Sequence, residues 1–203
     1  MLAVMTSPLP LVERKRRQAR QRIIEAAREL FLARGFDQVS VGDIAERAEV
    51  GRTTFFRHFG DKQEVVFANE QELLDTIAAA GRAGGIPAAR SATEAVEQLR
   101  PVLLALCAQA TADPEAYTRH FELIDQHPEL RDRDAMKVQQ IGGRLSELLV
   151  DRGCDQATAV LAGQIALACF QTAKQLGNDP RTLTGDTAAA LDRVLTLGTG
   201  TTD

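Results

Sequence analysis

The stretch from Ser40 to Lys62 constrains the fold more than any other part of this chain, because its pattern predicts two short helices joined by a tight turn. Ser40 and Asp43 make a Ser-x-x-Asp pattern, a variant of the capping box, in which the hydroxyl accepts from an amide and the carboxylate reaches back. A small apolar stripe follows, and Gly51 is expected to supply conformational freedom for the turn. The stretch therefore has the outline of a helix-turn-helix.

The second short helix is predicted to run from Arg52 to about Phe59. At 100° per residue, Phe55 and Phe59 fall on the same side, which indicates a buried face. The opposite arc carries Arg52, Thr53, Phe56 and Arg57. Arginine can form forked hydrogen bonds with guanine, and threonine can offer a hydroxyl or a methyl group to a base. This arc therefore has the chemistry needed to contact DNA.

His58 and Lys62 lie at the margins of this second helix. A histidine that packs against the small core and a histidine that contacts a phosphate are both open interpretations of His58. Gly60 is expected to end the helix and Asp61 to cap the next one, which places Lys62 in the first turn of that next helix.

Charge is unevenly distributed along the chain. The whole sequence has 24 Lys and Arg against 28 Asp and Glu, a net charge of −4. Between residues 13 and 62, however, 12 basic residues stand against 8 acidic ones. Binding to phosphates depends on the local patch and not on the total, so the acidic balance does not exclude a nucleic-acid partner.

A long helix is predicted before the helix-turn-helix, from Val12 to Arg34, with Gly35 ending it in the left-handed conformation. Its first turns carry Arg14, Lys15, Arg16, Arg17, Arg20 and Arg22. Taken alone, such a run is as well explained by a solvated surface as by phosphate binding. Its place beside a helix-turn-helix favours phosphate contact.

Two segments of this region resemble the DNA-binding domain of the TetR family of bacterial transcriptional regulators. They are Gly-Phe-Asp-Gln-Val-Ser-Val-Gly-Asp-Ile-Ala at 35–45 and Val-Gly-Arg-Thr-Thr-Phe-Phe-Arg-His-Phe-Gly-Asp-Lys-Gln-Glu-Val-Val-Phe at 50–67. The resemblance implies that Ser40 caps a helix and contacts phosphate, that Arg52 and Thr53 meet bases, and that Lys62 binds phosphate. The full set of DNA-binding residues that it implies is Ser40, Arg52, Thr53, Thr54, Phe56, Arg57, His58 and Lys62.

Two residues depart from the common pattern of that family. Many members have tyrosine where this chain has Phe56, so a hydroxyl that could donate to a phosphate is missing. Gly51 stands where serine or threonine often caps the second helix, which weakens that cap. The Phe-Phe-Arg variant looks like a subgroup of the family, so we do not interpret it as a broken site.

The rest of the sequence also has helical patterns. One helix is expected from Asp61 to about Ala80, followed by a loop at 81–87. Pro101 lies inside the next helical pattern and is expected to kink or divide it. The segment Asp155–Leu176 is apolar nearly all round, which predicts a helix buried on more than one side.

This apolar segment has two interpretations. It is either the central helix of a monomer or part of a subunit interface, where Ala159, Gly163 and Ala166 would let another helix approach closely. The resemblance favours an interface, since family members dimerise through their last two long helices as a four-helix bundle. Two-fold symmetry then places two recognition helices about one turn of DNA apart on a palindromic operator.

We therefore expect an all-α protein with a small three-helix helix-turn-helix domain and a larger helical domain for effector binding and dimerisation. The expected divisions are a disordered tail at 1–11, the DNA-binding domain at 12–60, a connecting helix at 61–80 and the effector and dimerisation domain at 81–203. The tail lacks the features of a signal peptide, and no apolar run reaches the roughly 20 residues that span a bilayer. A cytoplasmic protein is expected.

Motifs for catalysis and metal binding are missing from the sequence. The three histidines and three cysteines lack metal-ligand spacing, and no glycine-rich phosphate loop or Gly-x-Ser-x-Gly elbow occurs. Tyr117, His120 and Glu122 invite a catalytic interpretation, but such residues on an amphipathic helix usually pack or line a pocket. We expect no enzymatic activity, no cofactor and no metal.

The resemblance also implies an effector, a small molecule that binds among the middle helices and releases a repressor from its operator. A partly apolar molecule such as an acyl thioester fits the kind of body that the chain resembles. The candidate pocket residues are Leu103, Leu106, Tyr117, His120, Phe121, Ile124, Met136 and Gln140. The alternative is a helical ligand-binding or protein-interaction module that does not act through DNA. Activation in place of repression is also open.

Overall fold

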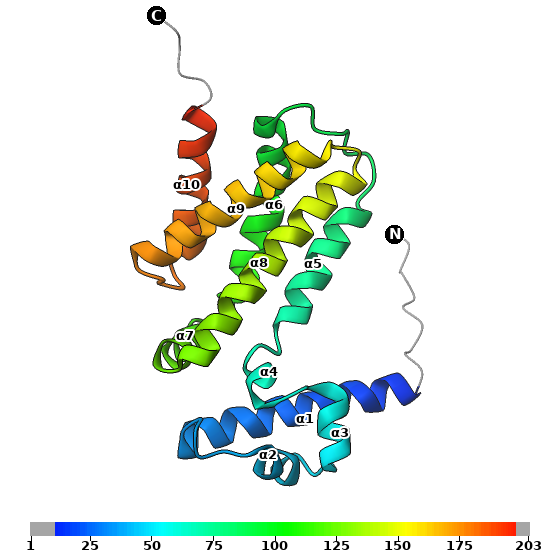
Figure 1. The fold of residues 1–203 in the computed structure, drawn as a ribbon, viewed down its shortest axis with the longest axis vertical. Coiled ribbons are helices and arrows are strands. Elements are labelled where there is room, and N and C mark those ends of the chain that lie inside the picture. Colours follow the sequence, from blue (N-terminus) through cyan, green and yellow to red (C-terminus); the bar gives the residue numbers. More distant parts are fainter. Residues whose placement is uncertain (1–10, 198–203) are drawn as a thin grey trace, which may run out of the picture. The chain divides into compact units, whose positions relative to one another are not determined.

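The computed structural model describes residues 11–197, and every regular element in that range is an α-helix. The helices form two compact units, residues 1–68 and residues 69–203, which we call the N-terminal and C-terminal units (Figure 1). The all-α prediction is confirmed. The tail predicted at residues 1–11 lies outside the described residues except for Leu11, which begins the first helix.

The N-terminal unit contains four helices around one small core. They are α1 (Leu11–Arg34), α2 (Val41–Arg47), α3 (Arg52–His58) and α4 (Lys62–Val66). Helix α1 packs against the other three, and α2 packs against α3. Ile23 of α1, Ile44 of α2 and Phe55 of α3 are completely buried and meet in this core. Gly35 follows α1 with a φ of 81°, as its position predicted.

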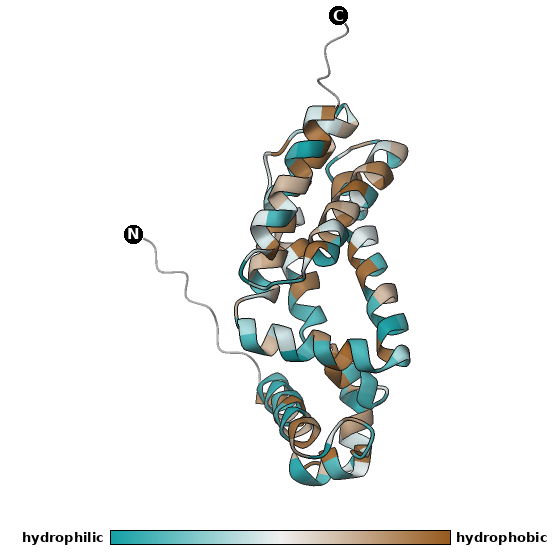
Figure 2. Cartoon of the chain, turned by 90° about the vertical axis from the view of Figure 1, so that its left-hand side faces the viewer, coloured by the Kyte–Doolittle hydropathy of each residue, from teal (hydrophilic) through white to brown (hydrophobic). Residues whose placement is uncertain are grey.

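The C-terminal unit contains the six remaining helices of the described range. They are α5 (Glu70–Arg82), α6 (Ala92–Ala110), α7 (Pro114–Gln126), α8 (Pro128–Asp151), α9 (Gln156–Leu176) and α10 (Leu183–Leu197). Helix α9 packs against α6, α8 and α10, so it is buried on several sides, as its all-round apolar sequence predicted. Apolar and polar residues alternate along the surrounding helices (Figure 2), because each of them has one buried face. Helix α6 continues through Pro101 and is not divided there.

Helices α8 and α9 approach closely at two glycines. A Cβ atom on Gly163 would stand 3.0 Å from the carbonyl oxygen of Gly142 and would overlap the hydroxyl of Ser146. That hydroxyl is itself used, because it donates a hydrogen bond of 3.1 Å to the Gly142 carbonyl. At Gly163 the close approach is therefore made by a helix of the same chain, whereas the prediction for this residue was an approach by a second subunit.

The prediction of one helix over 61–80 is wrong. Helix α4 ends at Val66, and α5 begins at Glu70 after Asn69. Val65 and Ala68 are buried in the core of the N-terminal unit, whereas Ile77 is buried in the core of the C-terminal unit. Helical periodicity alone did not reveal that the two parts of this segment belong to different cores.

Three further features of residues 11–197 bear on function. No helix within 11–197 is both long enough and apolar enough to cross a bilayer. In the same range, no group of three His, Cys, Asp or Glu side chains could hold a metal ion. Cys107, Cys154 and Cys169 are free thiols buried in the protein, and burial raises the pKa of each.

Candidate nucleic-acid interface

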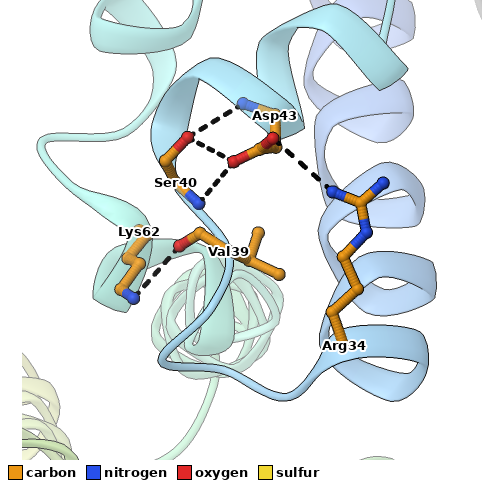
Figure 3. A network of polar contacts seen from close by, with 5 residues as sticks. All are labelled: Arg34, Val39, Ser40, Asp43 and Lys62. Carbon is orange, nitrogen blue, oxygen red and sulfur yellow. Dashed lines mark hydrogen bonds and ion pairs between the residues drawn. The ribbon is translucent and has the colours of Figure 1, made fainter.

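Helix α2 begins with the capping box that the sequence predicted (Figure 3). The Ser40 hydroxyl accepts a hydrogen bond of 3.2 Å from the Asp43 amide, and the Asp43 carboxylate accepts one of 2.8 Å from the Ser40 amide. The same hydroxyl donates to that carboxylate, which is the largest cause of a lowered pKa for Asp43. Arg34 adds a charge contact at 3.6 Å. Ser40 therefore has both an acceptor and a donor role inside the protein.

The turn between α2 and α3 differs from the prediction in one respect. Gly51 has an extended backbone with φ −70° and ψ 150°, whereas Glu49 takes the left-handed conformation with φ 52°. The Val50 amide donates to the Ala45 carbonyl at 2.9 Å and closes the turn. Gly51 is the N-cap of α3 and provides no side-chain hydrogen bond, so the weak cap that the sequence predicted is present.

Helix α3 has one buried face and one exposed face. Phe55 is 0% exposed and Phe59 is 5% exposed, and their rings are 5.9 Å apart between centroids. The exposed residues are Arg52, Thr53, Phe56 and Arg57, while Thr54 is half-buried. The Phe56 ring is 55% exposed and meets the Phe55 ring edge-on at 5.5 Å. The division into an anchoring face and a solvent-facing arc is confirmed.

His58 is half-buried among positive charges. Burial is the main reason that its pKa is lowered, and the charges of Arg16 and Arg20 on α1 and of Arg57 on α3 add to this effect. Both effects favour the neutral form of the imidazole. Its electrostatic coupling to Arg16 links the cations at the start of α1 to the end of α3.

The basic residues at the start of α1 have different roles. Arg20 donates a hydrogen bond of 2.5 Å to the carbonyl oxygen of Ala68 after α4, and its guanidinium lies 5.2 Å from the Phe59 ring centroid. Arg17 contacts Glu13 at 3.7 Å, and Arg22 contacts Glu49 at 4.0 Å. Three exposed cations of this run form no ion pair with any residue in the range 11–197, namely Arg14, Lys15 and Arg16. Only part of the run is thus available to a partner.

Lys62 has internal partners that the sequence did not reveal. Its ammonium group donates hydrogen bonds to the carbonyl oxygens of Phe36 at 2.9 Å and Val39 at 3.1 Å. It also lies 4.3 Å from the centroid of the Phe36 ring. These partners lie 26 and 23 residues away in sequence, so spacing gave no signal for them. The phosphate contact of Lys62 stays a prediction.

An open hollow of about 400 Å³ lies where α2 meets the start of α3. Its lining consists of Ser40, Gly42, Asp43, Ala45, Glu46, Val50 and Arg52. Two of these, Ser40 and Arg52, belong to the set that the resemblance implied for DNA contact. The structure therefore brings the cap of α2 and the first residue of α3 to one depression of the surface.

The candidate effector residues of α7 lie in a second region, in the C-terminal unit. Tyr117 is buried, with its hydroxyl donating to the Asn178 side chain at 2.5 Å, and burial raises its pKa. The Phe121 ring lies 4.6 Å from the Tyr117 ring and 5.0 Å from the His120 ring. Burial lowers the pKa of His120. These three residues therefore form one aromatic group.

Charged residues that the sequence did not single out border this aromatic group. Lys174 of α9 contacts Asp134 of α8 at 3.1 Å, and each side chain is only 20% exposed. The Lys174 ammonium also lies 4.1 Å from the Phe121 ring centroid. The aromatic group thus adjoins a partly buried ion pair.

The other candidate pocket residues do not all join this group. Leu103 and Leu106 are buried in the larger core of the C-terminal unit, and Ile124 is buried as well. Met136 is 65% exposed and Gln140 is also exposed, so neither lines an enclosed space within one chain. Their helical spacing on α8 was compatible with an inward face, but that helix turns Leu145 and Leu149 inward instead.

A family comparison agrees with the geometry of the N-terminal unit. Residues 23–68 match the family model described as bacterial regulatory proteins, tetR family. The matched range contains all of α2, α3 and α4 and the second half of α1.

Two curated regulators are similar over longer stretches. The HTH-type transcriptional regulator TcmR of Streptomyces glaucescens is 29% identical over 145 residues, which cover 70% of this chain and 63% of TcmR. The putative mycofactocin biosynthesis transcriptional regulator MftR of Mycobacterium tuberculosis is 32% identical over 127 residues, covering 59% of this chain and 58% of MftR. The chain thus spans less than two thirds of either relative.

Solved structures are also similar over most of the chain, and one example has a bound ligand. It is FadR of Thermus thermophilus, a TetR-family transcriptional repressor in complex with lauroyl-CoA. The TM-score is 0.59 at 25% identity, and the alignment covers 91% of this chain and 96% of that one. The likeness therefore extends beyond the helix-turn-helix into the helices that follow it.

Proposed function

The chain belongs to the TetR family of bacterial regulatory proteins, and on that premise we propose that it is a dimeric repressor that a small-molecule ligand releases from a palindromic DNA operator. One observation carries the DNA-binding part of this proposal. Helix α3 is anchored by two buried phenylalanines, and its opposite arc presents Arg52, Thr53, Phe56 and Arg57 to solvent. An anchored helix with a free polar arc can enter the major groove and contact base edges.

The unpaired cations of the N-terminal unit supply the phosphate contacts in this proposal. Arg14, Lys15 and Arg16 are exposed near the start of α1, and Arg57 is exposed on α3. Each phosphate that such groups neutralise releases counterions, so DNA affinity should fall steeply as salt is raised. The excess of acidic residues elsewhere in the chain does not act at this local surface.

The dimer interface in this proposal uses α9 and α10. Every exposed residue of α9 is uncharged, and Val160 and Leu161 are 43% and 51% exposed. A helix face that stays in water usually carries charges, so a long uncharged face favours contact with a second copy. Two-fold symmetry then sets two α3 helices about 34 Å apart on the operator.

The effector in this proposal binds in the C-terminal unit beside Tyr117, His120 and Phe121. An apolar body would pack against these rings, and a polar end would compete for Lys174 or Asp134. An acyl thioester has both parts, and the relative FadR is a repressor in complex with such a molecule, lauroyl-CoA. The ligand can shift DNA binding only by its different affinity for two arrangements of the protein. Such a regulator works in the bacterial cytoplasm and needs no catalytic group.

Footprinting on the DNA that flanks the gene of this protein tests the proposal. The wild type is expected to protect two half-sites, and acyl thioesters added to the reaction are expected to remove the protection. Arg52→Ala should abolish the footprint at moderate salt, whereas Arg181→Ala, an exposed cation of the C-terminal unit, should leave it intact. An intact footprint with Arg52→Ala would show that α3 does not contact the operator in this way. If no salt-sensitive footprint is found, the alternative is favoured, namely a helical ligand-binding or protein-interaction module that does not act through DNA.

The oligomeric state has its own test. Leu161→Arg places a charge on the uncharged face of α9 and should convert the dimer to a monomer in sedimentation velocity, with a parallel loss of DNA affinity. Gln139→Arg introduces the same charge at an exposed position of α8 and should leave the dimer intact. A dimer that persists with Leu161→Arg would show that the interface lies on another face of the protein.

A further inference from the structure

Gly42 occupies a position in α2 where the backbone does not require glycine. It is the second residue of a regular helix, and it is not among the glycines of residues 11–197 with a positive φ. Glycine is a poor helix former because it loses more conformational freedom on folding than any other residue. A reason for glycine at this position must therefore come from the space around it.

That space is taken by the side chain of Arg52. A Cβ atom on Gly42 would stand 2.6 Å from Nη2 of Arg52 and 3.4 Å from its Cζ. The other near atom is the Ser40 hydroxyl at 3.4 Å. Arg52 begins α3, on the far side of the turn, so its guanidinium reaches back across the first turn of α2.

Arg52 forms no hydrogen bond and no ion pair within residues 11–197. It lines the hollow between α2 and α3, to which Asp43 and Glu46 also contribute. Because no protein acceptor takes its donors, they are all available to a base or a phosphate.

We propose that Gly42 is a specificity-determining positioning residue, because the missing side chain lets the Arg52 guanidinium lie across α2 and so decides which base edge it meets. This inference rests on the proposed function, in which Arg52 contacts bases. A side chain at position 42 displaces the guanidinium from α2. The forked donors of Arg52 then point elsewhere, and the preference for guanine at the contacted base pair weakens.

A double-mutant cycle on the full-length protein tests this inference. The wild type, Gly42→Ala, Arg52→Ala and the double variant are titrated by fluorescence anisotropy against the operator and against operators with single base-pair changes. Gly42→Ala should reduce discrimination at one base-pair position by about fivefold or more, given the usual strength of an arginine–guanine pair. In the Arg52→Ala background the same change should have less than about a twofold effect, since coupled residues are not additive.

Two controls separate this effect from a loss of folding or a general change at α3. Gly42→Ala should melt at the same temperature as the wild type or higher, because alanine favours the helix. Gly60→Ala, whose added Cβ would meet no atom within 4 Å, should leave base preference unchanged.

Three outcomes would overturn the inference. If Arg52→Ala does not weaken DNA binding, the assignment of Arg52 to base contact fails and the inference fails with it. If Arg52→Ala weakens binding but Gly42→Ala leaves every base preference unchanged, only the role of Gly42 is wrong. If Gly42→Ala has an equal effect in both backgrounds, position 42 acts on DNA directly and not through Arg52. Where Arg52→Ala binds too weakly to measure, the base preferences of Gly42→Ala alone decide.

Discussion

The ammonium group of Lys62 donates a hydrogen bond of 3.1 Å to the carbonyl oxygen of Val39, the residue immediately before the capping serine of α2 (Figure 3). This contact joins the first turn of α4 to the loop that leads into α2. It gives Lys62 a structural role in the N-terminal unit that exists without DNA. Two of its three donors are used by carbonyl oxygens of the loop before α2, at Phe36 and Val39.

Lys62→Met should destabilise the N-terminal unit. The change removes two hydrogen bonds from a charged donor, and such bonds contribute about 1.5 to 3 kcal/mol. Hydrogen exchange at the amides of residues 36–44 should become faster. The midpoint temperature of the first thermal unfolding transition should decrease. Lys15→Met is the matched control, because Lys15 is exposed and should change only the salt dependence of DNA binding. If hydrogen exchange is unchanged and the DNA affinity of the variant depends less steeply on salt, Lys62 instead binds a phosphate directly.

Ser40→Ala should weaken the start of α2 and make its stability less sensitive to acid. Loss of the cap costs about 1 kcal/mol. Because the folded protein holds the pKa of Asp43 below its ordinary value, the unfolded chain takes up a proton first. That contribution to stability is present at neutral pH and is lost as the pH falls below about 4.

Urea unfolding of the N-terminal unit at several pH values measures this effect. The control is Ser91→Ala, which removes the equivalent cap of α6 in the C-terminal unit and should leave DNA binding unchanged. The same acid sensitivity in Ser40→Ala and wild type would mean that the lowered pKa of Asp43 does not depend on the Ser40 hydroxyl.

DNA affinity should rise as the pH falls from about 7.5 to 6, if His58 contacts a phosphate. In the free protein, burial and the charges of Arg16, Arg20 and Arg57 lower the pKa of His58, which favours the neutral ring. A phosphate offsets those charges and raises that pKa, so binding takes up a proton. His58→Gln should remove this pH dependence in anisotropy titrations. An identical pH profile in the variant would leave His58 as a packing residue.

The lowered pKa of His58 also affects the stability of the free protein. Because the folded state binds a proton at His58 less readily than the unfolded state, protonation favours unfolding. The contribution of His58 to stability should therefore decrease as the pH falls below about 6.5.

Phe56→Tyr should preserve or tighten operator binding. Phe56 is 55% exposed and its ring stands nearly perpendicular to the Phe55 ring, so a hydroxyl can be added without crowding the core. A new hydrogen bond to a phosphate would contribute about 0.5 to 1.5 kcal/mol. Gel-shift titration measures the affinity, with thermal unfolding as the check that stability is unchanged. A large loss of affinity would show that the ring makes a dry contact with DNA.

Gly163→Ala should destabilise the C-terminal unit, whereas Gly143→Ala should stabilise it. The added methyl group at 163 would overlap the Ser146 hydroxyl and press on the Gly142 carbonyl, and overpacking of this kind costs about 1 to 3 kcal/mol. At 143 nothing lies within 4 Å, so alanine should gain about 1 kcal/mol from helix propensity alone. Thermal unfolding of the two variants gives the comparison. Equal shifts in the unfolding temperature of the two variants would mean that α8 and α9 separate readily at this point.

Much of the fold could be predicted because local patterns specify helices and their ends. The Ser40 and Asp43 cap, the buried pair Phe55 and Phe59, and the left-handed Gly35 all follow from residues within four positions of each other. Hydrogen bonds and side-chain periodicity over one turn of helix act at that distance, so sequence spacing records them. The all-α class and the solvent-facing arc of α3 were determined in this way.

The contacts between elements were decided by the tertiary structure alone. Arg20 uses the carbonyl of Ala68 and Lys62 uses that of Val39, across 48 and 23 residues of sequence, while Arg52 fills the space above Gly42. Met136, whose spacing allowed an inward position, is exposed. A cation in the sequence has many possible partners, and only the packing of α1, α2, α3 and α4 brings one carbonyl or one open space within its reach. The helices are therefore local properties of this sequence, and the distinction between internal cations and those free for DNA comes from their packing.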